Sequence, residues 1–171
     1  GPIERFNTLF PQLQALSERK LTPLWSAGFD RLCLGIAQKL LIADSCGHIV
    51  DRLAGVQGAQ DLIHSWLFTL AFGMQIYYDF AGYTNMAIGI SLLFGVRLSE
   101  NFLAPYRASS IQIFWRRWHV TLSNWFRDYL YIPLGGSALG RTRTFLNLAL
   151  TMGLCGLRSE EHTSELQSQF R

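Results

Sequence analysis

The sequence has few charged residues and few cysteines, and each shortage excludes a class of protein. Charged residues make up 16% of the 171 positions, against about 25% in an ordinary soluble domain. The three cysteines, Cys33, Cys46 and Cys155, form no CxxC pair, so we expect neither a disulfide framework nor a zinc site. We interpret them as small apolar residues that fill space.

The first residues of the sequence also lack the pattern of a secretory signal peptide. The first residues, GPIERFNTLFPQL, contain no initiator methionine. They also lack the basic region followed by an apolar region that a secretory signal peptide requires. We therefore expect no signal peptide, and we expect the sequence to be an internal piece of a longer chain.

Charge is nearly absent from one long stretch. Between positions 62 and 96 the only formal charge is Asp79. The 17 residues 62–78 predict the clearest membrane span, at the short end of the length that a bilayer requires. The 15 residues 82–96 form a second uncharged run, which suits a tilted, re-entrant or protein-buried helix.

Other segments predict further helices and connectors. Apolar residues recur at spacings of three and four over 25–53, which indicates a helix. Lys39 and Asp44 interrupt it, so it is either a membrane helix with a polar stripe, which we favour, or an interfacial helix. We also expect a short amphipathic helix at 13–19 within an interfacial loop, helices at 111–127 and 144–157, and connectors at 54–61, 97–110 and 132–143.

Asp79 has two interpretations. Ionisable groups at membrane depth tend to face the interior of a helix bundle or a water-filled cavity. Alternatively, Asp79 lies in the headgroup region at the end of a span and caps a helix that begins near Gly82. The neighbouring Tyr77, Tyr78 and Tyr83 would suit an aromatic belt at the membrane interface equally well.

The stretch 114–136, FWRRWHVTLSNWFRDYLYIPLGG, combines tryptophans, arginines and one histidine. On a single helix, one face would carry Trp115, His119, Leu122 and Phe126. A basic amphipathic helix lying in the interface explains the arginines and tryptophans, but it does not explain a titratable histidine on the tryptophan face. Nucleic-acid binding by aromatic and basic residues is disfavoured by the adjacent apolar runs.

Three stretches together resemble the membrane-bound O-acyltransferase (MBOAT) family: KLLIAD, QIYYDFAGYTNMAIG and RLSENFLAPYRASSIQIFWRRWHVTLSNWFRDYLYIPLGG. The resemblance covers about residues 1–157. It is nearest to the branch of alginate O-acetyltransferase membrane subunits, and the teichoic acid D-alanyl transfer protein is a more distant relative. The resemblance implies an all-α, polytopic transmembrane helical bundle, here a partial MBOAT fold, with a tunnel through the bilayer.

The family has two prominent histidines. One lies in the W-R-R-W-H motif, which maps to His119. The other, usually assigned as catalytic, lies in a later G-L-W-H-G motif, whose start matches Gly156 and Leu157. Arg158 and Ser159 then stand where Trp and His should be. The resemblance therefore implies that His119 is an active-site partner, that the principal catalytic histidine is absent, and that this chain is inactive.

Further residues become candidates through the same resemblance. Ala81 and Asn85 replace the Ser and Asp of the branch's D-F-S-G-Y-S-D, so Asn85 keeps hydrogen-bonding capacity without charge. From their charge alone, we expect Arg116 and Arg117 to contact phosphates of lipid or donor. We expect Asp128 to pair with Arg127 or another arginine. The candidates for substrate binding or tunnel lining are Asp79, Tyr83, Asn85, Trp115, Trp118, Arg116, Arg117 and Asp128. We expect no metal ligands.

The chemistry needs a group that accepts a proton near physiological pH. A neutral histidine can take the proton of an acceptor hydroxyl as that oxygen attacks a thioester carbonyl. The resemblance implies acetyl-CoA or an acyl carrier as co-substrate, no bound cofactor, and a multi-pass location in the bacterial inner membrane. The implied partners are membrane lipid, an exported polysaccharide acceptor (alginate first) and periplasmic acetylation proteins, with no nucleic acid.

Two alternatives to alginate acetylation stay open. One is transfer of a D-alanyl or other acyl group to a different cell-envelope polymer. The other is a non-catalytic membrane scaffold that recruits a periplasmic partner.

The last residues differ in character from the rest. Residues 158–171 are hydrophilic and show no apolar periodicity, and the eleven residues RSEEHTSELQS match the conceptual translation of a common sequencing-library adapter. We therefore interpret 1–157 as an MBOAT membrane domain fragment and 158–171 as a disordered artefact in which His162 has no function.

Overall fold

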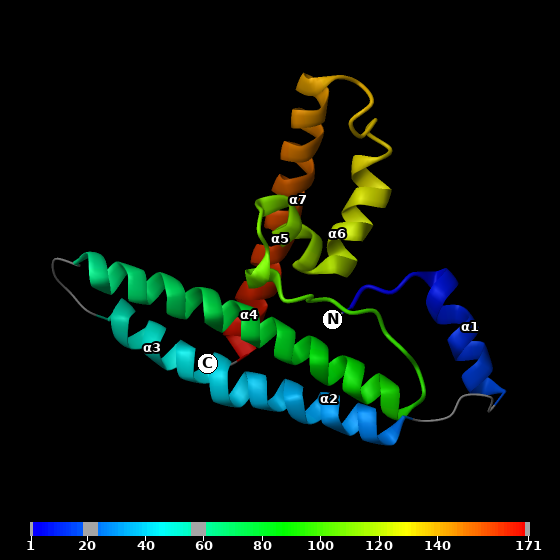
Figure 1. The fold of residues 1–171 in the computed structure, drawn as a ribbon, viewed down its shortest axis with the longest axis horizontal. Coiled ribbons are helices and arrows are strands. Elements are labelled where there is room, and N and C mark those ends of the chain that lie inside the picture. Colours follow the sequence, from blue (N-terminus) through cyan, green and yellow to red (C-terminus); the bar gives the residue numbers. More distant parts are fainter. Residues whose placement is uncertain (1, 19–23, 56–60, 170–171) are drawn as a thin grey trace. The chain divides into compact units, whose positions relative to one another are not determined.

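The computed structural model describes residues 2–18, 24–55 and 61–169. Within these ranges the chain forms α-, π- and 3₁₀-helices and no β-strand, and Figure 1 shows the α-helices. The predicted all-α class is confirmed. The chain divides into two compact units, Gly1–Leu103 and Ala104–Arg171.

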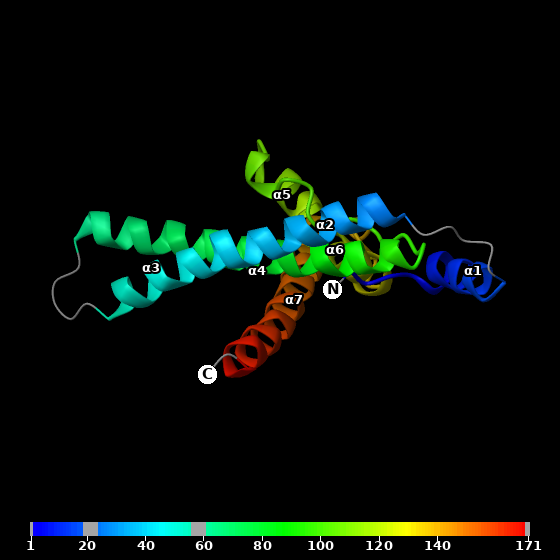
Figure 2. The same ribbon diagram turned by 90° about the horizontal axis from the view of Figure 1, so that it is seen from below.

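A helical hairpin is the centre of the first unit. Its first arm is a continuous helix made of α2 (Trp25–Ala37), the π-helical η1 (Gln38–Ala43) and α3 (Asp44–Ala54). Its second arm is α4 (Leu62–Leu93), which runs beside the first in the opposite direction (Figures 1 and 2). The predicted helix at 25–53 is therefore confirmed.

The ends of α4 explain why two uncharged runs form one helix. The Asp61 carboxylate accepts a hydrogen bond from the His64 backbone N–H at 2.7 Å, which is the usual interaction of an N-cap residue. Gly95, with φ of 82°, follows the last turn and closes it in the left-handed conformation typical of helix ends. Asp79 therefore lies inside a helix, and the alternative in which it caps a helix beginning near Gly82 is wrong.

Glycines allow the two arms of the hairpin to approach closely. Gly28 and Gly35 of α2 face Gly89 and Gly82 of α4. A Cβ atom at Gly35 would lie 2.6 Å from the Gly82 carbonyl oxygen, and one at Gly89 would lie 2.8 Å from the Gly28 carbonyl oxygen. Small residues are the usual means by which helix backbones pack closely in membranes. We call these four residues the glycine seam.

Membrane-spanning capacity differs between the two arms. Among the described helices, Trp25–Ala54 alone is both long enough and apolar enough to cross a membrane. α4 is long enough, with 32 residues, and Asp79 is its only formal charge. Its mean hydropathy is too low for a candidate span. Polar positions such as His64 and Gln75, together with tyrosines, lower that mean. By this measure the prediction that 62–78 is the clearest span is wrong.

The N-terminal helix is longer than expected. α1 (Phe6–Ser17) begins well before the predicted helix at 13–19 and includes Pro11. The Gln12 side chain donates to the Arg97 carbonyl oxygen at 3.1 Å and accepts from the Arg97 N–H at 2.8 Å. This pair of hydrogen bonds holds α1 to the chain that follows α4. The expected end at 19 and most of the connector 54–61 lie outside the described residues.

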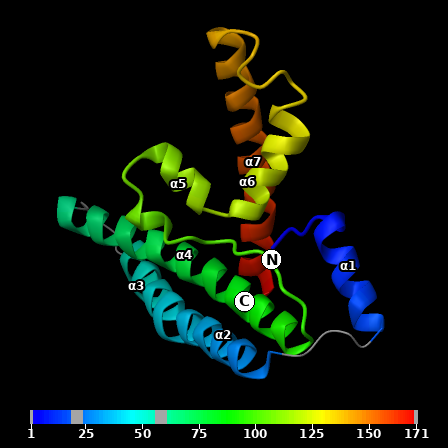
Figure 3. The same cartoon turned by 45° about the vertical axis from the view of Figure 1, so that its right-hand side comes forward.

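The second unit contains an interrupted helix followed by a helical hairpin. After η2 (Pro105–Arg107), two short helices, α5 (Ile111–Arg117) and α6 (Val120–Phe126), replace the single helix that we expected at 111–127 (Figure 3). The π-helical η3 (Arg127–Tyr131) and a glycine-rich turn lead to α7 (Arg141–Gln169). The predicted connectors at 97–110 and 132–143 are otherwise confirmed.

A buried asparagine fixes the glycine-rich turn. Asn147 of α7 is 4% exposed, and its Nδ2 donates to the carbonyl oxygens of Leu134 and Gly136, at 3.1 Å each. Gly136 and two neighbouring glycines have positive φ angles, which only glycine adopts without cost. The backbone of α7 is helical through 158–169, where we expected disorder, and the adapter-like origin of that segment stays a prediction.

Candidate functional site

A cavity of about 390 Å³ lies in the first unit. Its lining comes from α2, η1 and α4 of the hairpin and from residues 100–103 of the chain that follows α4. Its volume falls in the range of small-molecule sites, about 300–1,000 Å³. The hairpin therefore has a hollow on the side where the chain returns along it.

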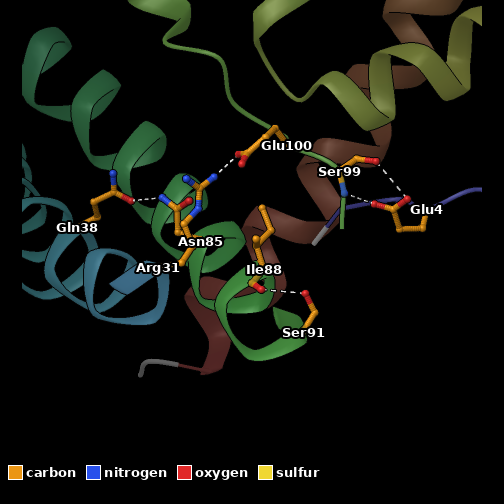
Figure 4. A network of polar contacts seen from close by, with 8 residues as sticks. All are labelled: Glu4, Arg31, Gln38, Asn85, Ile88, Ser91, Ser99 and Glu100. Atoms are coloured by element: carbon orange, nitrogen blue, oxygen red, sulfur yellow. Dashed lines mark hydrogen bonds and ion pairs between the residues drawn. The ribbon is translucent and has the colours of Figure 1, made fainter. Parts of the chain in front are cut away.

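Polar side chains from three helical elements and from the chain that follows α4 meet in this cavity (Figure 4). Asn85 Nδ2 of α4 donates to Gln38 Oε1 of η1 at 2.6 Å. The Arg31 guanidinium of α2 pairs with the Glu100 carboxylate. Asn85 was predicted as a site residue, and it lines the cavity as a neutral amide engaged with another amide.

Two polar atoms of the lining have no hydrogen-bond partner within the described part of the chain. They are Thr84 Oγ1 and Arg31 Nε, and Thr84 is only 2% exposed. A buried donor or acceptor without a partner costs about 1–3 kcal/mol. Such groups are uncommon in native proteins, and each one requires an explanation.

Asp79 belongs to a group of three charged residues. Lys39 Nζ lies 2.7 Å from Asp79 Oδ1 and 2.8 Å from Asp44 Oδ1. Lys39 and Asp44 are five residues apart, a spacing that turns side chains away from each other on an α-helix. The N–H of Asp44 donates to the carbonyl of Lys39, which is the π-helical pattern, and this wider turn brings the two side chains together. We call these residues the ion triplet.

The ion triplet explains how α4 accommodates a carboxylate in an apolar sequence. Ionisable residues at membrane depth usually pair with one another, and Asp79 does so with Lys39 of the other arm. Tyr83, another predicted site residue, is 53% exposed. Neither Asp79 nor Tyr83 belongs to the lining of the cavity.

His119 forms an elbow between α5 and α6 in the second unit. Its φ and ψ are 43° and 56°, the left-handed conformation that costs a non-glycine residue about 1–2 kcal/mol. Ser123 stabilises the elbow, since its N–H donates to the His119 carbonyl oxygen at 2.9 Å and its hydroxyl donates to the Trp118 carbonyl oxygen at 3.2 Å. The prediction that Trp115 and His119 share one helical face is wrong, because the helix is broken between them.

Aromatic rings pack beside this elbow. The rings of Phe114 and Trp118 stack with centroids 5.6 Å apart, and the Tyr106 ring lies 6.3 Å from that of Trp118. Trp115 meets Phe114 edge to face at 5.4 Å. Both tryptophans that we predicted as site residues thus belong to an aromatic cluster that supports the elbow.

The basic residues lie at the ends of their helices. Arg116 and Arg117 occupy the last turn of α5, where positive charge is favourable, and Arg117 Nη1 donates to the Arg107 carbonyl oxygen at 3.5 Å. The expected pair of Asp128 with Arg127 is confirmed, with Nε 2.8 Å from Oδ1. The Arg127 side chain is 57% exposed, and exposed pairs of this kind contribute only about 0–1 kcal/mol.

The predicted residues therefore fall into two groups, one in each unit. Asp79, Tyr83 and Asn85 are on α4, and the others are within 115–128. Sequence reasoning did not select the lining residues Arg31, Gln38, Thr84 and Glu100. For Arg31 and Gln38 the available signal was a polar side chain inside the apolar stretch 25–53. In the ranges that the structure describes, no three His, Cys, Asp or Glu side chains are close enough to hold a metal ion.

Comparison with known proteins gives these residues a family. The family model that matches is "MBOAT, membrane-bound O-acyltransferase family", over residues 1–156. The chain is 43% identical over 157 residues to the probable alginate O-acetylase AlgI of Pseudomonas syringae pv. tomato. The aligned region covers 92% of this chain and 30% of that protein.

Two other relatives act on different polymers, according to their names. The peptidoglycan O-acetyltransferase of Helicobacter pylori is 38% identical to this chain over 157 residues, and the aligned region covers 91% of this chain and 30% of that protein. The teichoic acid D-alanyltransferase of Bacillus subtilis is 31% identical to this chain over 134 residues, and the aligned region covers 77% of this chain and 34% of that protein. The chain thus spans about a third of the length of the curated relatives it matches. On the match over 156 of its residues, the chain belongs to the membrane-bound O-acyltransferase family.

Proposed function

We propose that this chain is part of an enzyme that transfers an acetyl group from a thioester donor to hydroxyl groups of an exported polysaccharide, with alginate as the first choice. The observation that supports this choice is the 43% identity to a probable alginate O-acetylase over 92% of the chain. The donor would be acetyl-CoA or an acyl carrier, and no bound cofactor is needed. Periplasmic acetylation proteins would act with it.

The relatives rank the alternative substrates. Identity falls from 43% for the alginate relative to 38% for the peptidoglycan relative and 31% for the D-alanyl relative. Acetyl transfer is therefore a better proposal than D-alanyl transfer, because both of the more similar relatives are named for acetyl groups. A non-catalytic scaffold is the remaining alternative.

His119 would act where the ester bond forms between the acetyl group and the acceptor hydroxyl. In this proposal its imidazole orients the acceptor or polarises the thioester carbonyl, while a second histidine takes the proton of the attacking hydroxyl. The left-handed backbone at His119 supports a functional role, since strained non-glycine residues cluster at active sites. The second histidine would follow Gly156 and Leu157, where Arg158 and Ser159 stand, so we propose that the chain in this form is inactive.

A multi-pass location in the bacterial inner membrane completes the proposal. Trp25–Ala54 has the length and hydropathy of a span. α4 packs against it along the glycine seam and exposes large apolar side chains at Leu62, Ile63 and Leu70. Because the ion triplet satisfies Asp79 internally, α4 could cross beside the first arm, and the two arms would enter the bilayer as a hairpin.

The experiment uses the protein in lipid nanodiscs with a radiolabelled acetyl thioester. Mannuronate oligomers, peptidoglycan fragments and teichoic acid are offered as acceptors, and D-alanyl donor is tested in parallel. The chain with Arg158 and Ser159 is compared with a form in which Gly156–Leu157 continues into Trp–His. We expect label on mannuronate oligomers with the second form only. Label on no polymer, with normal protein in the membrane, would favour the scaffold.

A further inference from the structure

We propose that the cavity of the first unit binds the hydroxyl face of a saccharide unit, with Thr84, Asn85 and Arg31 as its polar contacts. The inference deepens the proposed function, on which it rests, because it names the part of the chain that would hold an acceptor sugar. The evidence for it is the lining of the cavity. The residues that the family resemblance assigned to catalysis play no part in it.

The hydrogen-bonding capacity left over in the cavity specifies the chemistry of the ligand. Thr84 Oγ1 and Arg31 Nε line the same cavity, and neither has a partner among the described residues. The guanidinium Nε can only donate, whereas a hydroxyl both donates and accepts. A ligand hydroxyl satisfies both groups, since its oxygen accepts from Arg31 and its hydrogen or oxygen bonds to Thr84.

The charge of the lining favours hydroxyl groups over an anion. Arg31 and Glu100 are paired with each other, and the other lining residues are neutral, so the cavity offers no uncompensated charge. Asn85 supplies a neutral amide where the family branch commonly has a carboxylate. A fully ionic ligand would have to displace Glu100 from Arg31, whereas a polyol does not.

The remaining walls suit the carbon skeleton of a sugar. The Tyr77 and Phe102 rings meet edge to face at 5.7 Å and both line the cavity, together with Leu34. Aromatic rings and aliphatic side chains pack against the C–H faces of a pyranose while polar groups bind its edge. A volume of about 390 Å³ is adequate for a small ligand.

Binding is measured apart from catalysis, by calorimetry on the protein in lipid nanodiscs. The probes are neutral hexose oligomers and mannuronate oligomers. We expect both to bind with similar affinity. Thr84→Val should weaken binding about three- to tenfold, the usual effect of one lost hydrogen bond, while Thr84→Ser should stay within about twofold because it keeps the hydroxyl.

A second threonine of α4 gives the matched control. Thr69 is exposed and its hydroxyl donates to the Ser65 carbonyl oxygen at 2.8 Å, away from the cavity. Thr69→Val makes the same chemical change and should leave the affinity unaltered. Thr84→Val should also raise the melting temperature of the unliganded protein, because it removes a buried hydroxyl that has no partner.

Three results would overturn the inference. They are no binding of either oligomer, an affinity that Thr84→Val leaves unchanged, and a preference above tenfold for mannuronate, which would mean that Arg31 binds a carboxylate instead. Binding and acyl-thioester consumption are both followed in the form in which Gly156–Leu157 continues into Trp–His, because the chain with Arg158 and Ser159 is proposed to be inactive. Acyl transfer without Thr84-sensitive binding would reject this inference alone, and Thr84-sensitive binding without acyl transfer would reject the proposed function alone.

Discussion

Lys39 of η1 and Asp79 of α4 join the two arms of the hairpin through an ion pair of 2.7 Å. The same ammonium group contacts Asp44 at 2.8 Å, so one cation serves two carboxylates. The Lys39 side chain is 25% exposed, and those of Asp44 and Asp79 are about 40% exposed. The Lys39–Asp79 pair is thus partly buried.

Removal of Lys39 should therefore destabilise the hairpin more than removal of either carboxylate. Lys39→Met leaves two carboxylates close together without their cation, and we expect a loss of about 2 kcal/mol, between the values for exposed and buried pairs. Asp44→Asn should cost less, because the pair with Asp79 remains. Thermal unfolding in detergent measures both. Equal losses for the two variants would show that the ion triplet does not act as a unit.

The glycine seam gives a second prediction. Gly35→Ala would place a methyl group 2.6 Å from the Gly82 carbonyl oxygen, and we expect a loss of about 1–3 kcal/mol from this overpacking. Gly153→Ala on α7 is the control, because its Cβ would have no neighbour within 4 Å. That change should stabilise its helix by about 0.5–1 kcal/mol. A Gly35→Ala variant as stable as the parent would mean that the arms are farther apart.

Two variants of His119 separate backbone conformation from chemistry. Asparagine tolerates the left-handed region much better than alanine. We expect His119→Asn to retain the melting temperature and lose acyl transfer, whereas His119→Ala should lose acyl transfer and also about 1 kcal/mol of stability. The measurements are thermal unfolding and label transfer in the form that carries the second histidine. Full activity in His119→Asn would reduce His119 to a conformational role.

Asn147 should be important for the glycine-rich turn before α7. Asn147→Leu keeps the size of the side chain but removes the two hydrogen bonds to Leu134 and Gly136. We expect a loss of about 2 kcal/mol, since each bond contributes about 1 kcal/mol. Proteolysis within 132–140 should become faster. Thr144→Val serves as control, because its hydroxyl bonds only within the same turn of the helix, to Gly140; a similar loss there would argue against a specific role for Asn147.

Helices were the part of the fold that the sequence predicted well. The apolar period over 25–53 and the uncharged runs after position 62 identified both arms of the hairpin. The division of α4 at Asp79 was wrong because one charge inside an apolar stretch resembles a boundary. Its partner Lys39 is distant in the sequence, and only the register of the hairpin brings the two together.

The elbow could not be predicted from local pattern. Residues 111–127 contain no glycine or proline, and their apolar spacing fits one unbroken helix. The left-handed conformation of His119 is accompanied by the hydrogen bond from the Ser123 hydroxyl to the Trp118 carbonyl oxygen and by the stacking of Trp118 on Phe114, and the apolar spacing reveals neither contact. The cavity was missed for a similar reason, since Thr84 and Arg31 become significant only when contacts reveal which polar atoms lack partners.

The glycine seam limits how the hairpin can move. On each arm its glycines are seven residues apart, about two helical turns, and each lies against the backbone of the other arm. If one arm slid by a single residue, side chains would replace glycines at these crossings and collide with the opposing backbone. The close contacts at the glycine seam therefore allow one register of the two arms and oppose sliding of one arm along the other.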